Sequence, residues 1–298
     1  MLNLRKEVQK LLEKNEYVTC RYHGCFDIAA KKDNLLLLKV LFNVDSFQEK
    51  QAKNLKIISK NLNAHPLVVG MRTRREMLQV GIVYERFELP TVSLKTFENL
   101  ICYSIFPKIY RDRGGLYVEI DSKLLRESRK RKGLTQRELA EAVGINKKVI
   151  YEHEKIQLRM VLNIAQKLEA ILNKKLIKPV NIFKKFEERG EPKDSLEKRV
   201  GGKFETLGFQ TDYVGQAPLD IFAKEKVLII SDVEMNKKRM IRRAVNLKSF
   251  LKVVKKPAIL ITEKVKKDNI FGIPVLKREK LEEIESKEEV IEIAKESL

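Results

Sequence analysis

Continuous apolar runs and segments with helical spacing alternate near both ends of the chain. Unbroken apolar runs of four or five residues occur at 35–38, 66–70, 227–230 and 258–261. Short runs of this kind are typical of strands that are buried on both faces of a sheet. Amphipathic helical segments lie between them. The pattern predicts an α/β sandwich at each end, in the order helix, strand, strand, helix, strand, strand, helix.

The two ends also repeat each other. Residues 26–40 (FDIAAKKDNLLLLKV) align without a gap with residues 219–233 (LDIFAKEKVLIISDV). The similarity continues beyond these stretches in the same order, as between NLKIISKNLNAHPLVV and NLKSFLKVVKKPAILI. Small changes in offset fall in expected loops, where duplicated domains vary most. An internal duplication of one α/β domain is therefore predicted.

Acidic residues stand at matching places in the repeat. Asp27 and Asp220 each begin an expected strand, and the next strand contains Lys39 in the first copy and Asp232 and Glu234 in the second. This order resembles the PD-(D/E)XK nuclease superfamily, especially archaeal Holliday-junction resolvases. The resemblance implies that two carboxylates would hold a divalent metal while a lysine orients the attacking water. The first copy lacks the second acid, and the second copy has Glu234 where the lysine is expected.

Both nuclease-like copies are therefore predicted to be degenerate, with no catalytic residue, and the protein is not expected to be an enzyme. Asp27 and Asp220 are expected to bond the local backbone as strand-end or turn residues. The alternative is a metal-dependent, structure-specific DNA endonuclease. In that case Asp220, Asp232 and Glu234 of the second copy would converge on magnesium or manganese.

The middle third carries the most specific signal, SKLLRESRKRKGLTQRELAEAVGINKKVIYEHEK over 122–155. Thr135 and Glu138 have the spacing of a capping box at the start of a helix. Gly144 supplies a turn, and Asn146 is expected to cap the following helix. These signals predict two short helices joined by a tight turn, preceded by a helix with a basic face.

This stretch resembles the helix-turn-helix of the Xre/Cro-like phage-repressor family over about 30 residues. In that family the second helix of the motif lies in the major groove. The resemblance places four residues in the groove: Lys147, Lys148, Tyr151 and Glu152. Gln136 is expected to meet the phosphate backbone or to support the recognition helix. Arg129, Lys130 and Arg137 complete the candidate DNA-binding residues, and a purely structural helix pair is the alternative.

Composition agrees with a polyanionic partner. The 298 residues include 61 Lys and Arg against 41 Asp and Glu, a net charge of +20. A field of this sign favours nucleic acid, whereas a thermophile's charged surface usually balances its signs. The three cysteines and the absence of a long apolar run argue against a disulfide scaffold or a membrane span. A cytoplasmic location is predicted, with no cofactor.

Two further signals have an ordinary alternative. Cys20, His23 and Cys25 suggest zinc, but a structural site needs a fourth ligand, so buried thiols and no metal site are favoured. The basic clusters at 71–75 and 236–243 are interpreted as added phosphate contacts or as solvated surface. Neither signal changes the predicted class of protein.

Longer segments carry a third resemblance. RGG-x-YV-x-ID, the repressor-like motif and KPV-x-IF occur in that order before the C-terminal α/β domain. This arrangement is similar to the archaeal family named "Putative HTH-type transcriptional regulatory protein", and it covers most of the chain. It implies a DNA-binding regulator, and nothing in it implies catalysis.

The prediction for the whole chain is α/β: two restriction-endonuclease-like α/β sandwich domains that flank a central all-α, Xre/Cro-like helix-turn-helix domain. The expected parts are a degenerate nuclease-like domain, a hairpin or connector, the DNA-binding domain and the second degenerate copy, at 1–105, 106–121, 122–186 and 195–298. The expected partner is double-stranded DNA, with a homodimer as a hypothesis. A sequence-indifferent chromatin or scaffold protein is the remaining alternative. The operator, the sign of regulation and any effector do not follow from the sequence.

Overall fold

The computed structural model describes residues 4–112, 114–156, 158–262 and 267–298. The chain forms two compact units. Unit 1 contains residues 1–68 and 183–298, and unit 2 contains residues 69–182, so the boundary falls inside one strand. Unit 1 is therefore built from two segments that are far apart in the sequence. The domain boundaries proposed from the sequence stay predictions beside this division.

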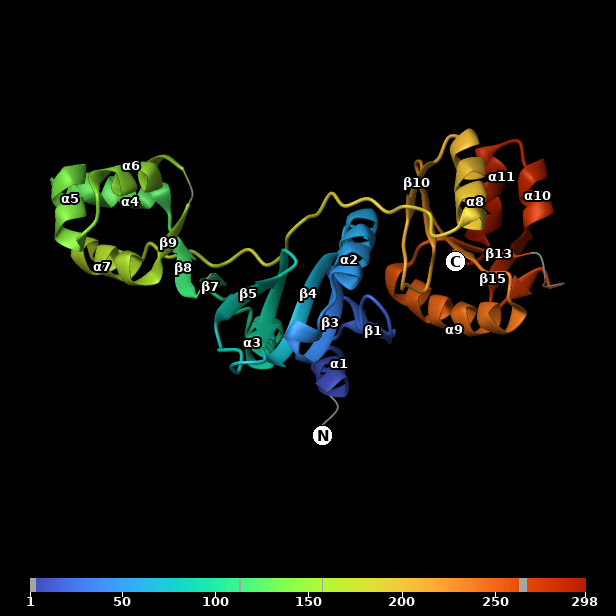
Figure 1. The fold of residues 1–298 in the computed structure, drawn as a ribbon, viewed down its shortest axis with the longest axis horizontal. Coiled ribbons are helices and arrows are strands. Elements are labelled where there is room, and N and C mark those ends of the chain that lie inside the picture. The colour runs from blue at the N-terminus through green and yellow to red at the C-terminus, as the bar shows by residue number, and fades with distance from the viewer. Residues whose placement is uncertain (1–3, 113, 157, 263–266) are drawn as a thin grey trace. The chain divides into compact units, whose positions relative to one another are not determined.

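The N-terminal segment of unit 1 is a small sheet with helices, coloured blue in Figure 1. Its elements are α1 (Leu4–Lys14), β1 (Val18–Arg21), β2 (Ile28–Lys31), β3 (Leu35–Asn43), the 3-10 helix η1 (Val44–Ser46), α2 (Glu49–Leu62) and β4 (His65–Arg72). The strands lie in the order β1-β2-β3-β4. The first six residues of β3 are all buried, as expected for a strand that is covered on both faces.

The C-terminal segment, yellow-gold to red in Figure 1, repeats this arrangement. Its elements are α8 (Ser195–Thr206), β10 (Gln210–Tyr213), β11 (Ile221–Lys224), β12 (Leu228–Val233), α9 (Lys237–Val254), β13 (Ala258–Thr262), β14 (Asn269–Ile270), β15 (Ile273–Lys277), α10 (Arg278–Glu283) and α11 (Lys287–Lys295). The strand order is β10-β11-β12-β13-β15-β14, and β13 is parallel to both of its neighbours.

Strand pairing confirms the repeat. Ala30 on β2 pairs with Leu36 on β3, and the equivalent residues Ala223 and Ile229 pair on β11 and β12. Because the register is equal in the two copies, side chains at equivalent positions face the core in both. The predicted element order needs a correction, because three strands rather than two precede the central helix of each copy and three follow it.

The two segments of unit 1 contact each other through polar and aromatic groups. The Cys25 N–H donates to the Gln216 carbonyl at 2.9 Å, and Asn54 Oδ1 accepts from the Gly215 N–H at 2.7 Å. The Phe26 and Phe250 rings pack with their centroids 5.5 Å apart. The duplicated domains are therefore joined within one chain, much as two subunits are joined in a dimer.

Unit 2 continues from the end of β4 and ends in a group of helices, labelled α4 to α7 in Figure 1. Its elements are β5 (Ile82–Arg86), β6 (Leu89–Ser93), α3 (Leu94–Tyr103), β7 (Ile109–Asp112), β8 (Gly115–Glu119), α4 (Ser122–Arg131), α5 (Gln136–Val143), α6 (Lys147–Lys155), β9 (Arg159–Val161) and α7 (Leu162–Leu172). The strand order is β4-β6-β5-β7-β8-β9, and β7 and β8 form the predicted hairpin.

The region from 122 to 186 is not all helical, which corrects the predicted fold class. Strand β9 pairs with β8 in antiparallel register, with Met160 opposite Val118. Both side chains are buried in the same core as the helices. Strand β9 thus follows α6 closely in the sequence and joins the sheet. The chain is a mixed α/β protein. In unit 2, helices α4 to α7 pack against the end of the sheet that contains β8 and β9.

Candidate functional site

Local sequence signals set the helix-turn-helix of unit 2. Thr135 Oγ1 accepts from the Glu138 N–H at 3.1 Å, and a Glu138 carboxylate oxygen accepts from the Thr135 N–H at 2.7 Å. This is the predicted capping box. Gly144 ends α5 with a φ of +77°, and Asn146 Oδ1 accepts from the Lys148 N–H at 2.8 Å. The start of α6 is therefore fixed by its own cap.

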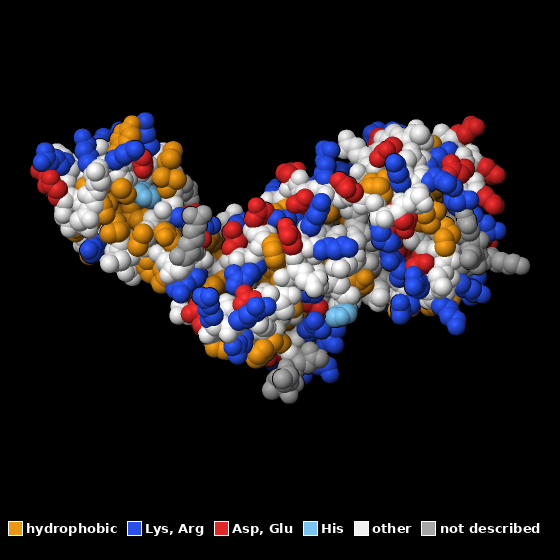
Figure 2. Space-filling view, in the orientation of Figure 1, with side chains coloured by type: hydrophobic (Ala, Val, Ile, Leu, Met, Phe, Trp, Pro, Cys, Tyr) orange, Lys and Arg blue, Asp and Glu red, His pale blue; other side chains and the backbone are white. Residues whose placement is uncertain are grey.

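Packing turns the first turn of α6 toward solvent. Leu139, Ala140 and Ile150 are buried between the helices, and Ala140 is small enough for α6 to cross α5 closely. Lys147 and Lys148 are exposed. Figure 2 shows Lys and Arg side chains on the outer surface of these helices. The predicted recognition helix thus presents cations next to its positive end.

The other candidate residues of α6 lie on the same helix with more neighbours. Tyr151 is 43% exposed, and the Lys155 Nζ lies 4.8 Å from its ring centroid. Glu152 is half-buried and lies 3.8 Å from Lys148 Nζ, a weak ion pair. The Tyr151 ring and the first-turn lysines are therefore the most exposed of the four candidate residues.

The three remaining basic candidates differ in their surroundings. Lys130 and Arg137 are exposed, and Arg137 forms an exposed ion pair with Glu141 at 2.9 Å. Arg129 is only 8% exposed, because it lies on the buried side of α4. Its Nε and Nη2 donate to the two Glu154 oxygens at 2.6 and 3.0 Å. This placement corrects the assignment of Arg129 to the exposed basic face.

Glu154 is the centre of a polar network that holds α6 in place. Besides the two hydrogen bonds from Arg129, it accepts one from Gln136 Nε2 at 2.8 Å. Gln136 is thus hydrogen-bonded to α6, as the supporting role among its two predicted alternatives requires. Burial acts to raise the pKa of Glu154, but the hydrogen bonds from Arg129 and Gln136 outweigh it and hold the pKa below its ordinary value.

Glu154→Ala is expected to lower the free energy of unfolding by about 2–4 kcal/mol, because Arg129 would be left buried without its carboxylate. Since the folded-state pKa of Glu154 lies below its unfolded value near 4.5, this stabilisation is present above that pH. It is lost as the pH falls through the folded pKa. Urea unfolding at several pH values measures it. Glu141→Ala, which removes an exposed carboxylate, should change stability by less than about 0.5 kcal/mol.

The first nuclease-like copy holds its aspartate against two cations of the chain. Asp27 Oδ2 accepts from the Val40 N–H at 2.8 Å, as expected for a residue that bonds the local backbone. Arg5 Nε lies 3.0 Å from Oδ1, and Lys39 Nζ lies 3.4 Å from Oδ2. Lys39 is buried and also donates to the Gly24 carbonyl at 2.7 Å. The carboxylate is thus neutralised inside the fold.

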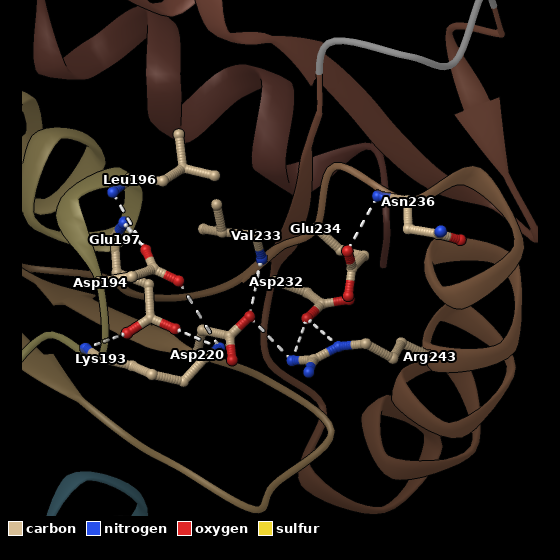
Figure 3. Close-up of polar contacts among 10 residues, drawn as sticks. All are labelled: Lys193, Asp194, Leu196, Glu197, Asp220, Asp232, Val233, Glu234, Asn236 and Arg243. Carbon is tan, nitrogen blue, oxygen red and sulfur yellow. Dashed lines mark hydrogen bonds and ion pairs between the residues drawn. The ribbon is translucent and has the colours of Figure 1, made fainter.

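In the second copy a different cation, Arg243, neutralises the buried aspartate, as Figure 3 shows. Asp220 Oδ2 accepts from the Val233 N–H at 3.0 Å, and Arg243 Nη2 lies 2.8 Å from the same carboxylate. Arg243 Nε donates to Asp232 Oδ1 at 2.7 Å. In the repeat, Lys39 occupies the place of Asp232. The first copy thus has a buried lysine where the second has a buried carboxylate.

Burial governs the titration of this second cluster. It raises the pKa of Asp232 well above the ordinary value, and the charge of Asp220 raises it further, while Arg243 opposes both. For Arg243, burial alone would lower the pKa, but the two carboxylates raise it above its ordinary value. The guanidinium therefore stays charged and serves as the counter-ion of the pair.

The cluster does not fit a divalent metal. The Arg243 guanidinium bridges Asp220 and Asp232, so their facing oxygens already have a cationic partner. Glu234 is turned to the backbone, where its Oε1 accepts from the Asn236 N–H at 2.8 Å. Among the described residues, no three His, Cys, Asp or Glu side chains are grouped to hold a metal. The three carboxylates do not converge.

The stretch from Cys20 in β1 to Cys25 before β2 agrees with the interpretation as buried thiols. Cys20 and Cys25 are free and buried. Burial raises the pKa of each thiol to about 12, so both are protonated near neutral pH. In the part of the chain that the structure describes, no helix is long and apolar enough to cross a bilayer.

The fold defines a mixed α/β protein with a repeated α/β domain and a capped pair of helices, α5 and α6, joined by a tight turn. A family model described as "PD-(D/E)XK superfamily domain" matches residues 1–107. The protein named "Putative HTH-type transcriptional regulatory protein" of Pyrococcus furiosus is 32% identical, over 97% of this chain and 96% of its own length. The chain belongs to this family.

Two further relatives carry the same name. The protein of Methanothermobacter thermautotrophicus is 33% identical, over 97% of this chain and 94% of its own length. That of Methanocaldococcus jannaschii is 30% identical, over 99% of this chain and 96% of its own length. No solved structure matches the chain. The matches cover both units, so the family resemblance is not limited to the nuclease-like part.

Proposed function

We propose that the protein binds double-stranded DNA through α6 and regulates transcription. The observation that carries this proposal is the exposed first turn of a capped α6, with Lys147 and Lys148 open to solvent. An α-helix fits the major groove of B-form DNA, and lysines at its N-terminal end reach base edges or phosphates. The names of the relatives support a regulator. The Xre/Cro-like character of the motif is part of the proposal.

Affinity comes mainly from charge in this mechanism. A net charge of +20 attracts the duplex, and each neutralised phosphate releases counter-ions. Binding therefore falls steeply as salt is added. Two chains paired across a symmetric site would place two α6 helices in successive grooves, so we propose a homodimer on DNA. A cytoplasmic location belongs to the same proposal.

Genomic footprinting with the full chain tests the regulatory role. A regulator is expected to protect a limited set of sites, because contacts from α6 to base edges discriminate between sequences. Uniform protection that follows only DNA abundance would contradict the proposal and support a sequence-indifferent chromatin or scaffold protein. Lys147 and Lys148 can act as point charges on phosphates, so this comparison separates the two possibilities.

We further propose that neither nuclease-like copy cleaves DNA. The support is the internal cation in each site, Lys39 in the first copy and Arg243 in the second. Incubating the full chain with branched and linear duplexes in magnesium or manganese should leave both substrates intact. Metal-dependent cleavage that is lost on Asp220→Asn would overturn this proposal, since it would require the cluster to release Arg243 and take up the metal.

A further inference from the structure

A positively charged cleft lies between the two copies of unit 1. Its volume is about 890 Å³. Six of its lining side chains are cationic and two are carboxylates; the lining consists of Arg5, Arg21, Tyr22, His23, Asp27, Lys193, Glu234, Arg239, Arg242, Arg243 and Asn246. Both copies contribute, because α1 and β1 belong to the first and α9 to the second. The cleft thus exists only where the duplicated domains meet.

The α9 side of the cleft is an arginine-rich helix face. Arg239, Arg242, Arg243 and Asn246 follow the spacing that places residues on one side of a helix. Arg243 is committed to the buried aspartates. Arg239 and Arg242 are exposed, and among the described residues neither has a carboxylate at ion-pair distance. Two arginines of this wall are therefore free to bind an external anion.

The chemistry of the lining favours phosphate groups. A guanidinium presents a planar set of donors that matches phosphate oxygens in pairs. The first turns of α9, which begins after its cap at Asn236, add the positive end of the helix dipole. The Tyr22 ring is half-buried and packs 5.3 Å from the Phe26 ring. This gives the cleft one rigid aromatic wall beside its cations.

The size of the cleft favours a small ligand over a polymer. Small-molecule sites typically measure about 300–1,000 Å³, and this cleft falls within that range at about 890 Å³. Its lining is a single cluster around the two degenerate sites. A nucleic-acid strand would use a longer groove to neutralise successive phosphates. The geometry therefore favours a compact polyanion.

We propose that this cleft binds a small molecule that carries an oligophosphate group, either a nucleoside polyphosphate or a free oligophosphate. Arg239 and Arg242 contact the phosphates from one copy. Arg21 and Arg5, which also pairs with Asp27, line the cleft from the other. A ligand that contacts both copies links them, so its binding stabilises unit 1. The proposal does not depend on DNA binding by α6, which lies in unit 2.

The test is calorimetric titration of the full chain at about 0.15 M salt with three probes: adenosine triphosphate, inorganic tripolyphosphate and a single-stranded oligonucleotide. Arg239→Gln/Arg242→Gln is expected to weaken binding of the phosphate probes by at least about ten-fold, because charge-assisted contacts are lost. The matched control is Lys237→Gln/Lys238→Gln. It removes the same charge from exposed residues of α9 that do not line the cleft.

The two phosphate probes show whether the cleft prefers a nucleoside polyphosphate or a free oligophosphate. Tighter binding of adenosine triphosphate identifies a nucleotide, and equal binding identifies the oligophosphate alone. The proposal is overturned if neither phosphate probe binds, or if the control variant loses as much affinity as the cleft variant. It is also overturned if only the oligonucleotide binds through Arg239 and Arg242, which would make the cleft a nucleic-acid site. Duplex binding by α6 should be unchanged in both variants, which separates this result from a failure of the proposed function.

Discussion

Lys147→Ala/Lys148→Ala should lower the affinity for duplex DNA by about 10- to 100-fold near 0.1 M salt, because phosphate or base contacts would be lost. Both lysines are exposed in the first turn of α6. Removing two phosphate contacts should also reduce the slope of log affinity against log salt by about two. Stability should change by less than about 0.5 kcal/mol, since neither side chain is part of the core. Titration of a labelled duplex at several salt concentrations measures affinity and slope together.

The matched control is Lys174→Ala/Lys175→Ala, two adjacent exposed lysines that follow α7 in the same helical group. This pair lowers the net charge by the same amount without touching α6. If affinity depends only on net charge, both double variants will weaken binding equally. Unchanged retention of duplex DNA by the α6 variant would rule out α6 as the recognition helix. A loss confined to the α6 variant would support the groove contact.

The helix-turn-helix was predictable because its signals are local. A capping box needs only Thr135 and Glu138 three residues apart, and a turn needs only a glycine that tolerates positive φ, as Gly144 does. Such signals do not depend on the rest of the fold. The repeat was predictable because the gapless alignment of 26–40 with 219–233 is visible in the sequence itself. Local rules therefore determined the boundaries of α5 and α6.

Arg129 shows where local rules were insufficient. Basic residues cluster in α4, so charge alone placed Arg129 with its exposed neighbours. The buried residues of α4 are Leu125, Ser128 and Arg129, a helical spacing that was visible in the sequence. What the sequence did not show is the partner, Glu154, which lies 25 residues away on α6. A buried arginine is stable only with such a partner, so its side of the helix is decided by tertiary contacts.

The cations that pair with the aspartates of the two copies could not be predicted either, because tertiary contacts also decide which side chain turns inward. The repeat identified Asp27, Asp220 and their strands. The sequence alone leaves two interpretations of the run around Arg243, a phosphate surface or solvated residues, because spacing does not show which arginine turns inward. Arg243 turns toward Asp220 and Asp232, whereas Arg242 next to it is exposed. One helix thus supplies both the counter-ion of the degenerate site and part of the wall of the adjacent cleft.

Arg243→Met is expected to lower the free energy of unfolding by about 3–5 kcal/mol near neutral pH, the largest stability change proposed for this chain. Methionine can occupy much of the space of the arginine but brings no charge, so Asp220 and Asp232 would be buried together without a counter-ion. Urea unfolding of the full chain measures the loss. Arg242→Met is the matched control, because that side chain is exposed on the same helix and should cost less than about 0.5 kcal/mol.

The pH dependence distinguishes lost electrostatics from lost packing. The folded-state pKa of Asp232 is raised above its unfolded value near 3.8 by burial and by Asp220, and removing Arg243 raises it further. The folded state then binds more protons than the unfolded state, so stability is greatest in acid and falls as the pH rises through the folded pKa. The deficit of Arg243→Met should therefore shrink toward pH 4, and Asp232→Asn/Arg243→Met should recover much of it at neutral pH. A deficit independent of pH, with no recovery in the double variant, would mean that Arg243 acts by packing and that the aspartates need no internal cation.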